Sequence, residues 1–246
     1  MKRKEVIFMI LGFIVLIVLV SFSVINNAKR PVSDLEIKFL AEKPNYFLNE
    51  DIIKKIINEE SEDIMKLTLN KVDVKRIEDK IAVNPYIDSV QVSKNVKGTI
   101  FFDIKTNVPI ARVNTPKGEF YISEKGQKMP LSKINSATVI LVQGDVKEDE
   151  YIELGEFIKA INTDDLLKNH IIGIEKVGKK SYNLIVNRGN FFIELGTLNN
   201  FEKKIKNLKL FYEQYVDFVG MEDYEKLSLK FINQVVATKR TIHNEQ

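Results

Sequence analysis

The chain has 246 residues, of which 44% are hydrophobic and 29% charged, enough for one large folded domain or two small ones. It has no cysteine and only two histidines, which excludes a disulfide scaffold, a thiolate zinc site, a cysteine nucleophile and a histidine-rich metal site. The net charge of +3 resides in residues 1–30, which carry +4 and leave −1 for the remainder. A near-neutral body lacks the basic surface that nucleic-acid binding requires.

An uncharged run over residues 6–25 follows the basic residues Lys2, Arg3 and Lys4. About 20 helical residues span roughly 30 Å, the thickness of the hydrocarbon core of a bilayer. The positive-inside rule keeps the tip, residues 1–5, in the cytoplasm. The run therefore predicts a single-pass transmembrane helix in the cytoplasmic (inner) membrane, with the bulk of the chain on the extracytoplasmic side.

A cleaved signal peptide is the alternative for this segment, because Ser21, Phe22 and Ser23 have the small-residue spacing of a cleavage site. The apolar core of a signal peptide is about 7–15 residues long, however, and this run is longer. The length favours an uncleaved anchor.

A first small domain is predicted over residues 33–106. Alternation predicts a strand over residues 35–40, and isoleucines at helical spacing predict a helix that begins at Asn49. Asp73 is expected to cap a second helix, which ends before Pro85 because the residue preceding proline avoids helical angles. Strands follow at 86–93 and 99–105. The order strand, helix, helix, strand, strand predicts a small α+β unit.

This order resembles a POTRA domain. The stretch that carries the resemblance ends the second helix and begins the next strand: Asn84-Pro85-Tyr86-Ile87-Asp88-Ser89-Val90-Gln91-Val92. The resemblance implies an interaction module and not an enzyme.

A second, β-rich domain is predicted over residues 108–240, followed by a flexible tail at 241–246. Short strands are expected at 110–114, 119–123, 137–142, 171–177, 182–187 and 190–195. One helix is expected at 148–161, with buried Ile152, Phe157, Ile158 and Ile161. A longer helix is expected at 201–219, and Lys203, Lys204 and Lys206 are assigned to its solvent-exposed face.

The end of this domain shows a change of pattern. Leu227, Leu229 and Phe231 alternate with polar residues, and then the apolar phase shifts. Such a shift indicates a bulge or a tight turn near residues 232–233. The last strand is therefore expected at 234–238, near a sheet edge.

The whole arrangement resembles the FtsQ/DivIB family of bacterial cell-division proteins. Beside the POTRA-like stretch, the resemblance rests on 120–126 with 129–132, and on 201–208 with Tyr224, 227–231 and 233–236. It implies an α+β fold: a single N-terminal transmembrane helix, a POTRA-like βααββ domain and a β-rich mixed domain with a long helix. It also implies a non-enzymatic divisome scaffold at the division septum. The implied partners are FtsB/DivIC- and FtsL-type bitopic proteins and, indirectly, the septal peptidoglycan synthases.

The resemblance places the partner contact in the terminal strand region, where an exposed edge can accept a strand from another chain. Matched by position, the contact residues are Phe231, Asn233, Gln234, Val235, Val236 and Lys239. The alternative, that Phe231 and Val235 fill the domain core, stays open because apolar strand residues are usually core.

No catalytic constellation emerges from the sequence. Ser123, Ser132 and Ser181 lie outside any nucleophile-elbow pattern, and His170 is assigned to the start of a strand. Asp164 and Asp165 are expected to begin a helix rather than to bind a metal. We therefore expect no cofactor, metal, small-molecule substrate or nucleic acid. Two other functions remain: a membrane-anchored POTRA-type chaperone or translocation adaptor, and a cell-wall enzyme, which needs a carboxylate pair.

Overall fold

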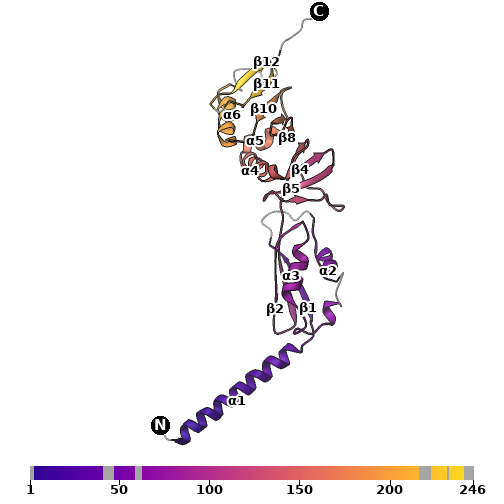
Figure 1. Cartoon of the computed structure of the whole chain (residues 1–246), viewed down its shortest axis with the longest axis vertical. Helices are drawn as coiled ribbons and strands as arrows, with labels where there is room; N and C mark the ends of the chain where they lie inside the picture. Colours follow the sequence, from indigo (N-terminus) through magenta and orange to yellow (C-terminus); the bar gives the residue numbers. More distant parts are fainter. Residues whose placement is uncertain (1–2, 41–46, 59–62, 216–222, 232, 241–246) are drawn as a thin grey trace, which may run out of the picture. The chain divides into compact units, whose positions relative to one another are not determined.

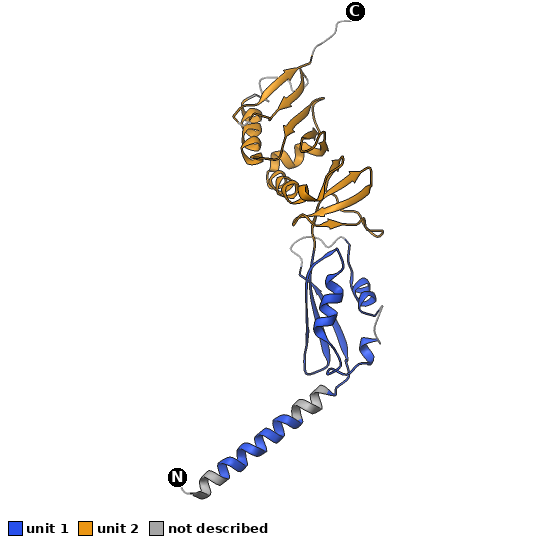
Figure 2. Ribbon diagram, in the orientation of Figure 1, with its two compact units in different colours: residues 1–106 blue, residues 107–246 orange. Residues whose placement is uncertain are grey.

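The computed structural model describes residues 3–40, 47–58, 63–215, 223–231 and 233–240. The chain divides into two compact units, Met1–Thr106 and Asn107–Gln246 (Figure 2). The end of the helix predicted to reach residue 219, residue 232 of the predicted turn and the tail at 241–246 lie outside the described residues.

The first element is the helix α1, Arg3–Ala28 (Figure 1). Its described side chains, residues 8–22, are all exposed. Within the part of the chain that the structure describes, no helix has the length and hydropathy needed to cross a membrane.

The rest of unit 1 has the predicted order, with one short 3₁₀ helix added. Its elements are β1 (Asp34–Phe39), α2 (Glu50–Asn58), η1 (Ile64–Lys66), α3 (Val74–Ala82), β2 (Ile87–Lys94) and β3 (Thr99–Thr106). The side chain of Asp73 caps α3 by accepting from the backbone N–H of Arg76 at 3.1 Å, as expected for an N-cap residue. The sheet order is β1-β3-β2, with β1 parallel and β2 antiparallel to β3.

One face of this small sheet carries the core of unit 1. Ile100, Phe102 and Ile104 alternate along β3 and are fully buried. They share a single hydrophobic cluster with Ile53 and Ile57 of α2 and Ile81 of α3. The two amphipathic helices therefore cover this face, which is the layer arrangement that a βααββ unit allows.

The described residues of unit 2 form one nine-stranded sheet. Its strands are β4 (Pro109–Thr115), β5 (Gly118–Ser123), β6 (Lys128–Met129), β7 (Ile140–Gln143), β8 (Ile171–Lys176), β9 (Tyr182–Val186), β10 (Phe192–Gly196), β11 (Tyr224–Ser228) and β12 (Val236–Lys239). The helical elements are η2 (Glu148–Glu150), α4 (Tyr151–Asn162), α5 (Asp165–His170) and α6 (Phe201–Tyr215). The strand order is β12-β11-β10-β9-β8-β7-β4-β5-β6.

A row of apolar residues crosses this sheet from β4 to β12 and faces the core. The strand registers align Val113, Val142, Ile174, Leu184, Ile193, Leu227 and Ala237. Buried residues of α4, α5 and α6 pack against this row in one cluster, among them Leu154, Phe157, Leu167, Leu208 and Tyr212. The predicted α+β class, with a βααββ first unit and a β-rich second unit, is confirmed.

Three assignments in unit 2 are wrong. Ile152 is 64% exposed, since the buried face of α4 is formed by Tyr151, Leu154, Phe157, Ile158 and Ile161. Lys204 is buried rather than solvated. His170 does not begin a strand but ends α5, the helix that was expected to begin at Asp164 and Asp165.

Candidate partner-binding edge

The strand β12 forms one end of the nine-stranded sheet. It pairs antiparallel with β11, with Ser228 opposite Val236 and Leu227 opposite Ala237. No second strand pairs with β12 among the described residues, so its other side ends the ladder. A terminal strand of this kind presents backbone N–H and C=O groups that another chain can pair with.

The backbone bonds show which groups of β12 point away from β11. The N–H of Arg240 donates to the C=O of Asp223 at 2.8 Å, and these two residues flank the pair of Lys239 and Tyr224. In an antiparallel ladder, a bond between the neighbours of two opposed residues identifies these two as a non-hydrogen-bonded pair. The backbone N–H and C=O groups of each residue in such a pair point away from the partner strand. The backbone N–H and C=O groups of Lys239 therefore point to the side of β12 that faces away from β11. Because this direction alternates from residue to residue along a strand, the backbone groups of Ala237 point to the same side.

The six predicted contact residues fall into two groups. Val236, 38% exposed, and Lys239, also exposed, lie in β12. The others lie in the segment that connects β11 to β12: Phe231, Asn233, Gln234 and Val235. The strand thus begins two residues later than predicted, because the N–H of Gln234 turns back to the C=O of Phe231 at 3.4 Å.

The two apolar candidates in the connecting segment differ in burial. Phe231 is 55% exposed, so it does not fill the core and does not continue the buried alternation of Leu227 and Leu229. Val235 is partly buried and packs against the core cluster of unit 2. The core alternative is therefore wrong for Phe231 and holds in part for Val235.

Ion pairs hold the start of the connecting segment against β10. The carboxylate of Glu194 lies 2.6 Å from Lys230 and 3.5 Å from Lys226, and the N–H of Leu229 donates to the C=O of Glu194 at 2.8 Å. The hydrogen bond from Lys230 lowers the pKa of Glu194, against the opposing effect of its partial burial. The carboxylate therefore stays charged and pairs Lys226 of β11 and Lys230 of the connecting segment with β10.

Sequence reasoning missed two residues of this edge. Ala237 packs inward against the core while its backbone faces outward, and an alanine carries no sequence signal for either role. Arg240 follows β12, and its guanidinium donates to the C=O of Asn190 in the loop before β10. This bond ties the end of β12 to a second loop.

Two of the residues considered for catalysis, Ser123 and Asp164, have structural roles. Ser123 Oγ accepts from the N–H groups of Lys125 and Gln127 at 3.3 and 3.1 Å in the turn after β5. Asp164 Oδ1 accepts from Leu166 and Leu167, each at 3.1 Å, and so caps α5. Within the described ranges, no group of three or more histidine, cysteine, aspartate or glutamate residues could hold a metal ion.

His170 is also bonded within the fold rather than poised for chemistry. Its Nδ1 lies 3.2 Å from Asn187 Oδ1 and its Nε2 lies 2.8 Å from the hydroxyl of Tyr212. Because an amide oxygen only accepts, Nδ1 carries the hydrogen and Nε2 accepts from Tyr212. Burial lowers the pKa of His170 and raises that of Tyr212, so the neutral forms are favoured.

Comparison with known proteins assigns both units. A model described as POTRA-like domain matches residues 31–105, and a model described as FtsQ/DivIB, C-terminal related, matches residues 108–238. The protein therefore consists of a POTRA-like unit followed by a β-rich unit whose sheet ends in the open strand β12. The chain belongs to the FtsQ/DivIB family of cell-division proteins.

Among solved structures, this chain is similar to the major extracytoplasmic domain of the cell-division protein DivIB from Geobacillus stearothermophilus, in its trans isomer. It is 16% identical, with a TM-score of 0.33, and the match covers 46% of this chain and 97% of that one. No curated protein matches this chain.

Proposed function

We propose that this chain is a non-enzymatic scaffold of the divisome that binds FtsB/DivIC- and FtsL-type bitopic proteins by strand addition to β12. Through these partners it links to the septal peptidoglycan synthases. The observation that carries the proposal is the position of β12 at the end of the sheet, with the backbone groups of Lys239 and Ala237 directed away from β11. A partner strand satisfies these groups and extends the sheet.

The other end of the same sheet is less suited to strand addition. Its terminal strand, β6, has only the two residues Lys128 and Met129, and Met129 is fully buried. The segment after β6 also folds back onto the sheet, since the N–H of Ala137 donates to the hydroxyl of Tyr121 at 3.3 Å. The longer and more open β12 is therefore the better binding edge.

The edges of the POTRA-like sheet are partly occupied by their own side chains. On β2, the N–H of Val92 donates to the carboxylate of Glu78 at 2.8 Å. On β1, the N–H of Leu35 donates to the side chain of Asp34, also at 2.8 Å. Blocking of this kind protects edge strands from pairing. It argues against a chaperone or translocation adaptor that captures extended polypeptides on this unit.

The six residues contribute to the proposed complex in different ways. Val236 and Lys239 lie along the added strand, and their side chains would select the partner sequence. Phe231, Asn233 and Gln234 are exposed in the segment before β12 and would contact the part of the partner that leaves the sheet. Val235 supports the edge from the core side.

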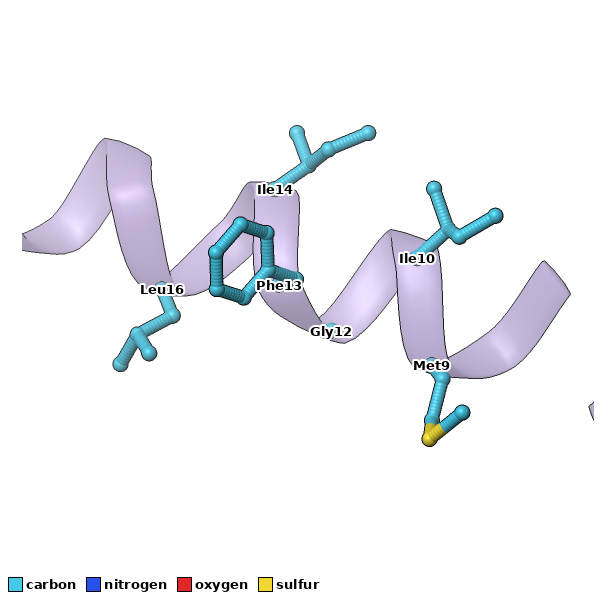
Figure 3. Close-up of a pocket in the computed structure, with 6 residues that line it drawn as sticks. All are labelled: Met9, Ile10, Gly12, Phe13, Ile14 and Leu16. Carbon is cyan, nitrogen blue, oxygen red and sulfur yellow. The ribbon is translucent and has the colours of Figure 1, made fainter. Parts of the chain in front are cut away.

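We place the scaffold in the cytoplasmic membrane at the division septum, with α1 as a single-pass anchor and a cytoplasmic N-terminus. Figure 3 shows Met9, Ile10, Phe13, Ile14 and Leu16 projecting from α1, and each is more than half exposed. The hollow between these side chains lies on the helix surface and is lined by apolar residues and Gly12. Such a surface is costly in water and favourable in lipid.

A pair of variants at one position tests the strand-addition model. Lys239→Pro removes the outward N–H while leaving the Arg240 to Asp223 bond available, and proline is tolerated on edge strands. Lys239→Ala removes the side chain but keeps the N–H. We expect Lys239→Pro to lose binding to the DivIC-type partner in a titration, and Lys239→Ala to retain most of it.

The opposite outcome contradicts the model: equal binding by both variants, with hydrogen exchange confirming that β11 and β12 remain folded, excludes pairing at this edge. Imaging of a fluorescent fusion tests the location separately, since uniform envelope signal without a mid-cell band contradicts a role in division. An assay on peptidoglycan tests the absence of cell-wall activity.

A further inference from the structure

A set of basic residues gathers at the end of unit 1 where the chain leaves α1. It comprises Lys29, Arg30, Lys66, Lys71 and Lys97, all exposed, together with the exposed apolar side chains of Met65 and Val96. We call these seven residues the basic end of unit 1. They come from three separate segments: residues 29–30, the region around η1, and the turn between β2 and β3.

Backbone hydrogen bonds bring the first two segments together. The N–H of Leu69 donates to the C=O of Arg30 at 2.9 Å, and the N–H of Val32 donates to the C=O of Leu67 at 2.9 Å. Pro31 and Thr68 form an isolated antiparallel bridge between these bonds. Leu67 and Leu69 are thus bonded to the chain that follows α1. Lys66 is next to Leu67 and Lys71 is two residues after Leu69, so both lysines lie close to that chain.

The turn between β2 and β3 is bound to the same place. The guanidinium of Arg30 donates to the C=O of Val96 at 3.2 Å, and the N–H of Ser33 donates to the C=O of Gly98 at 2.9 Å. Gly98 has a φ of +106°, and a Cβ there would lie 2.8 Å from the C=O oxygen of Pro31. This close approach fixes Val96 and Lys97 beside Arg30.

A third contact holds the segment after η1 against the end of β2. The ammonium of Lys94 donates to the C=O groups of Leu69 and Val72 at 2.7 and 3.0 Å. Hydrogen bonds therefore hold the three segments of the basic end together, so that their side chains form one surface.

Within the ranges that the structure describes, three acidic groups lie near these charges. Asp63 pairs with Lys66 at 3.8 Å and also caps η1 by accepting from the N–H of Met65. Asp34 and Asp73 lie near the same end, and each accepts from a backbone N–H, those of Leu35 and Arg76. Among the described residues, the five exposed cations of the basic end outnumber these three carboxylates.

Covalent connection places this surface beside the end of α1. Arg30 is two residues beyond Ala28, and two residues of extended chain span only about 7 Å. If α1 is an anchor, as proposed above, the basic end lies at the membrane surface whatever the direction in which α1 leaves the unit.

We infer that the basic end of unit 1 docks on anionic lipid headgroups, with Val96 and Met65 entering the interface between them. Exposed cations beside an anionic membrane surface each strengthen attachment roughly fivefold, and exposed apolar side chains next to them add burial in the headgroup region. The docking would hold the POTRA-like unit in one orientation on the membrane. This inference rests on the proposed anchor.

Two matched positions allow a direct test, because the chain has no tryptophan. Val96→Trp places a single indole in the basic end. Val83→Trp places it after α3, at the opposite end of β2, where Val83 is 82% exposed against 63% for Val96. Both full-length variants are inserted into nanodiscs of phosphatidylcholine with or without phosphatidylglycerol, and quenching by headgroup-proximal doxyl lipid is measured.

In discs with phosphatidylglycerol, we expect the indole at position 96 to be quenched at least twofold more than the indole at position 83. The triple change Lys66→Glu, Lys71→Glu and Lys97→Glu should remove this difference. Changing three exposed lysines of unit 2 to Glu, namely Lys133, Lys168 and Lys179, should preserve it. Raised salt should weaken the quenching, as screening requires.

Equal quenching at both positions, or quenching at position 96 that survives the triple change, overturns the docking model. If the basic end binds an acidic protein or polymer instead of lipid, we expect equal quenching at both positions. A chain that fails to enter the discs instead contradicts the anchor of the proposed function, and is recognised by its separation from the discs in size-exclusion chromatography.

Discussion

The carboxylate of Glu150 forms an ion pair with the ammonium of Lys176, and both side chains are buried. Glu150 lies in η2 and Lys176 at the end of β8, so the pair joins the start of α4 to the sheet. The hydroxyl of Tyr182 donates to the second carboxylate oxygen at 2.8 Å, and Lys176 also donates to the C=O of Asp145 at 2.8 Å. Burial alone would raise the pKa of Glu150, but these partners and the N–H of Lys147 lower it overall.

Replacing Lys176 with methionine should destabilise unit 2 by about 3–5 kcal/mol, because an uncompensated carboxylate then stays buried. The matched control is Lys180→Met, whose pair with Asp149 at 3.5 Å is exposed and should matter by less than about 1 kcal/mol. Hydrogen exchange of β8 and β9 amides in urea measures both. Similar losses for the two variants would show that Glu150 relaxes into water.

Lys204 offers a second test of burial. It is 3% exposed, and it donates to the C=O groups of Leu195 and Thr197 at 3.0 and 2.6 Å, tying the first turn of α6 to the end of β10. Lys204→Met leaves these carbonyls without their donor and should cost about 1–3 kcal/mol. Lys203→Met, on the exposed side of the same turn, should stay within about 0.5 kcal/mol of the parent in urea unfolding. A neutral Lys204→Met would mean that water replaces the ammonium.

His170 should make the stability of unit 2 depend on pH near neutrality. Its pKa is lowered mainly by burial, and further by Arg188, while its bond to Asn187 acts in the opposite direction. The unfolded chain, with a histidine pKa of about 6.5, therefore binds a proton before the folded chain does as the pH falls. Stability should decrease from pH 7.5 through pH 5.5, and His170→Gln should flatten that slope. If the parent and His170→Gln show the same dependence of stability on pH, another titratable group is responsible for it.

Phe231 tests the proposed interface without disturbing the core. Because it is 55% exposed, Phe231→Ser should leave the unfolding free energy within about 0.5 kcal/mol of the parent. If the aromatic side chain anchors the partner, affinity for the DivIC-type protein should fall by more than about fivefold, as at an interface hot spot. Ile172→Ser, at an exposed position in β8, is the control. Equal effects of both changes in a binding titration would remove Phe231 from the contact.

Local patterns predicted most elements because each carries its own signal. Alternating apolar residues predicted β1 and β3, and Asp73 and Asn49 marked helix starts through side chains that accept from Arg76 and Ile52. The two-residue β6 and the six-residue α5 are too short for a periodic signal. The strand order, in which β4 lies beside β7 and β10 beside β11, depends on long-range packing that no local window contains.

The wrong burial assignments have separate causes. Ile152 is six residues from Ile158, or about 600° of helical rotation, so the two cannot share a face. Lys204 is buried because distant carbonyls accept its protons, and sequence spacing does not reveal such acceptors. The terminal edge was predicted from a shift in apolar phase, but the outward direction of the Lys239 backbone required the bond between Arg240 and Asp223.

The position of β12 has a mechanical consequence. Hydrogen bonds between strands run across the strand direction, so tension along a strand added to β12 would load all of them together. Tension at right angles would instead open them one after another from the end. In the proposed complex, such a joint would resist sliding along the strand and yield to peeling, so a rotation of the partner would separate it without first overcoming its full strength.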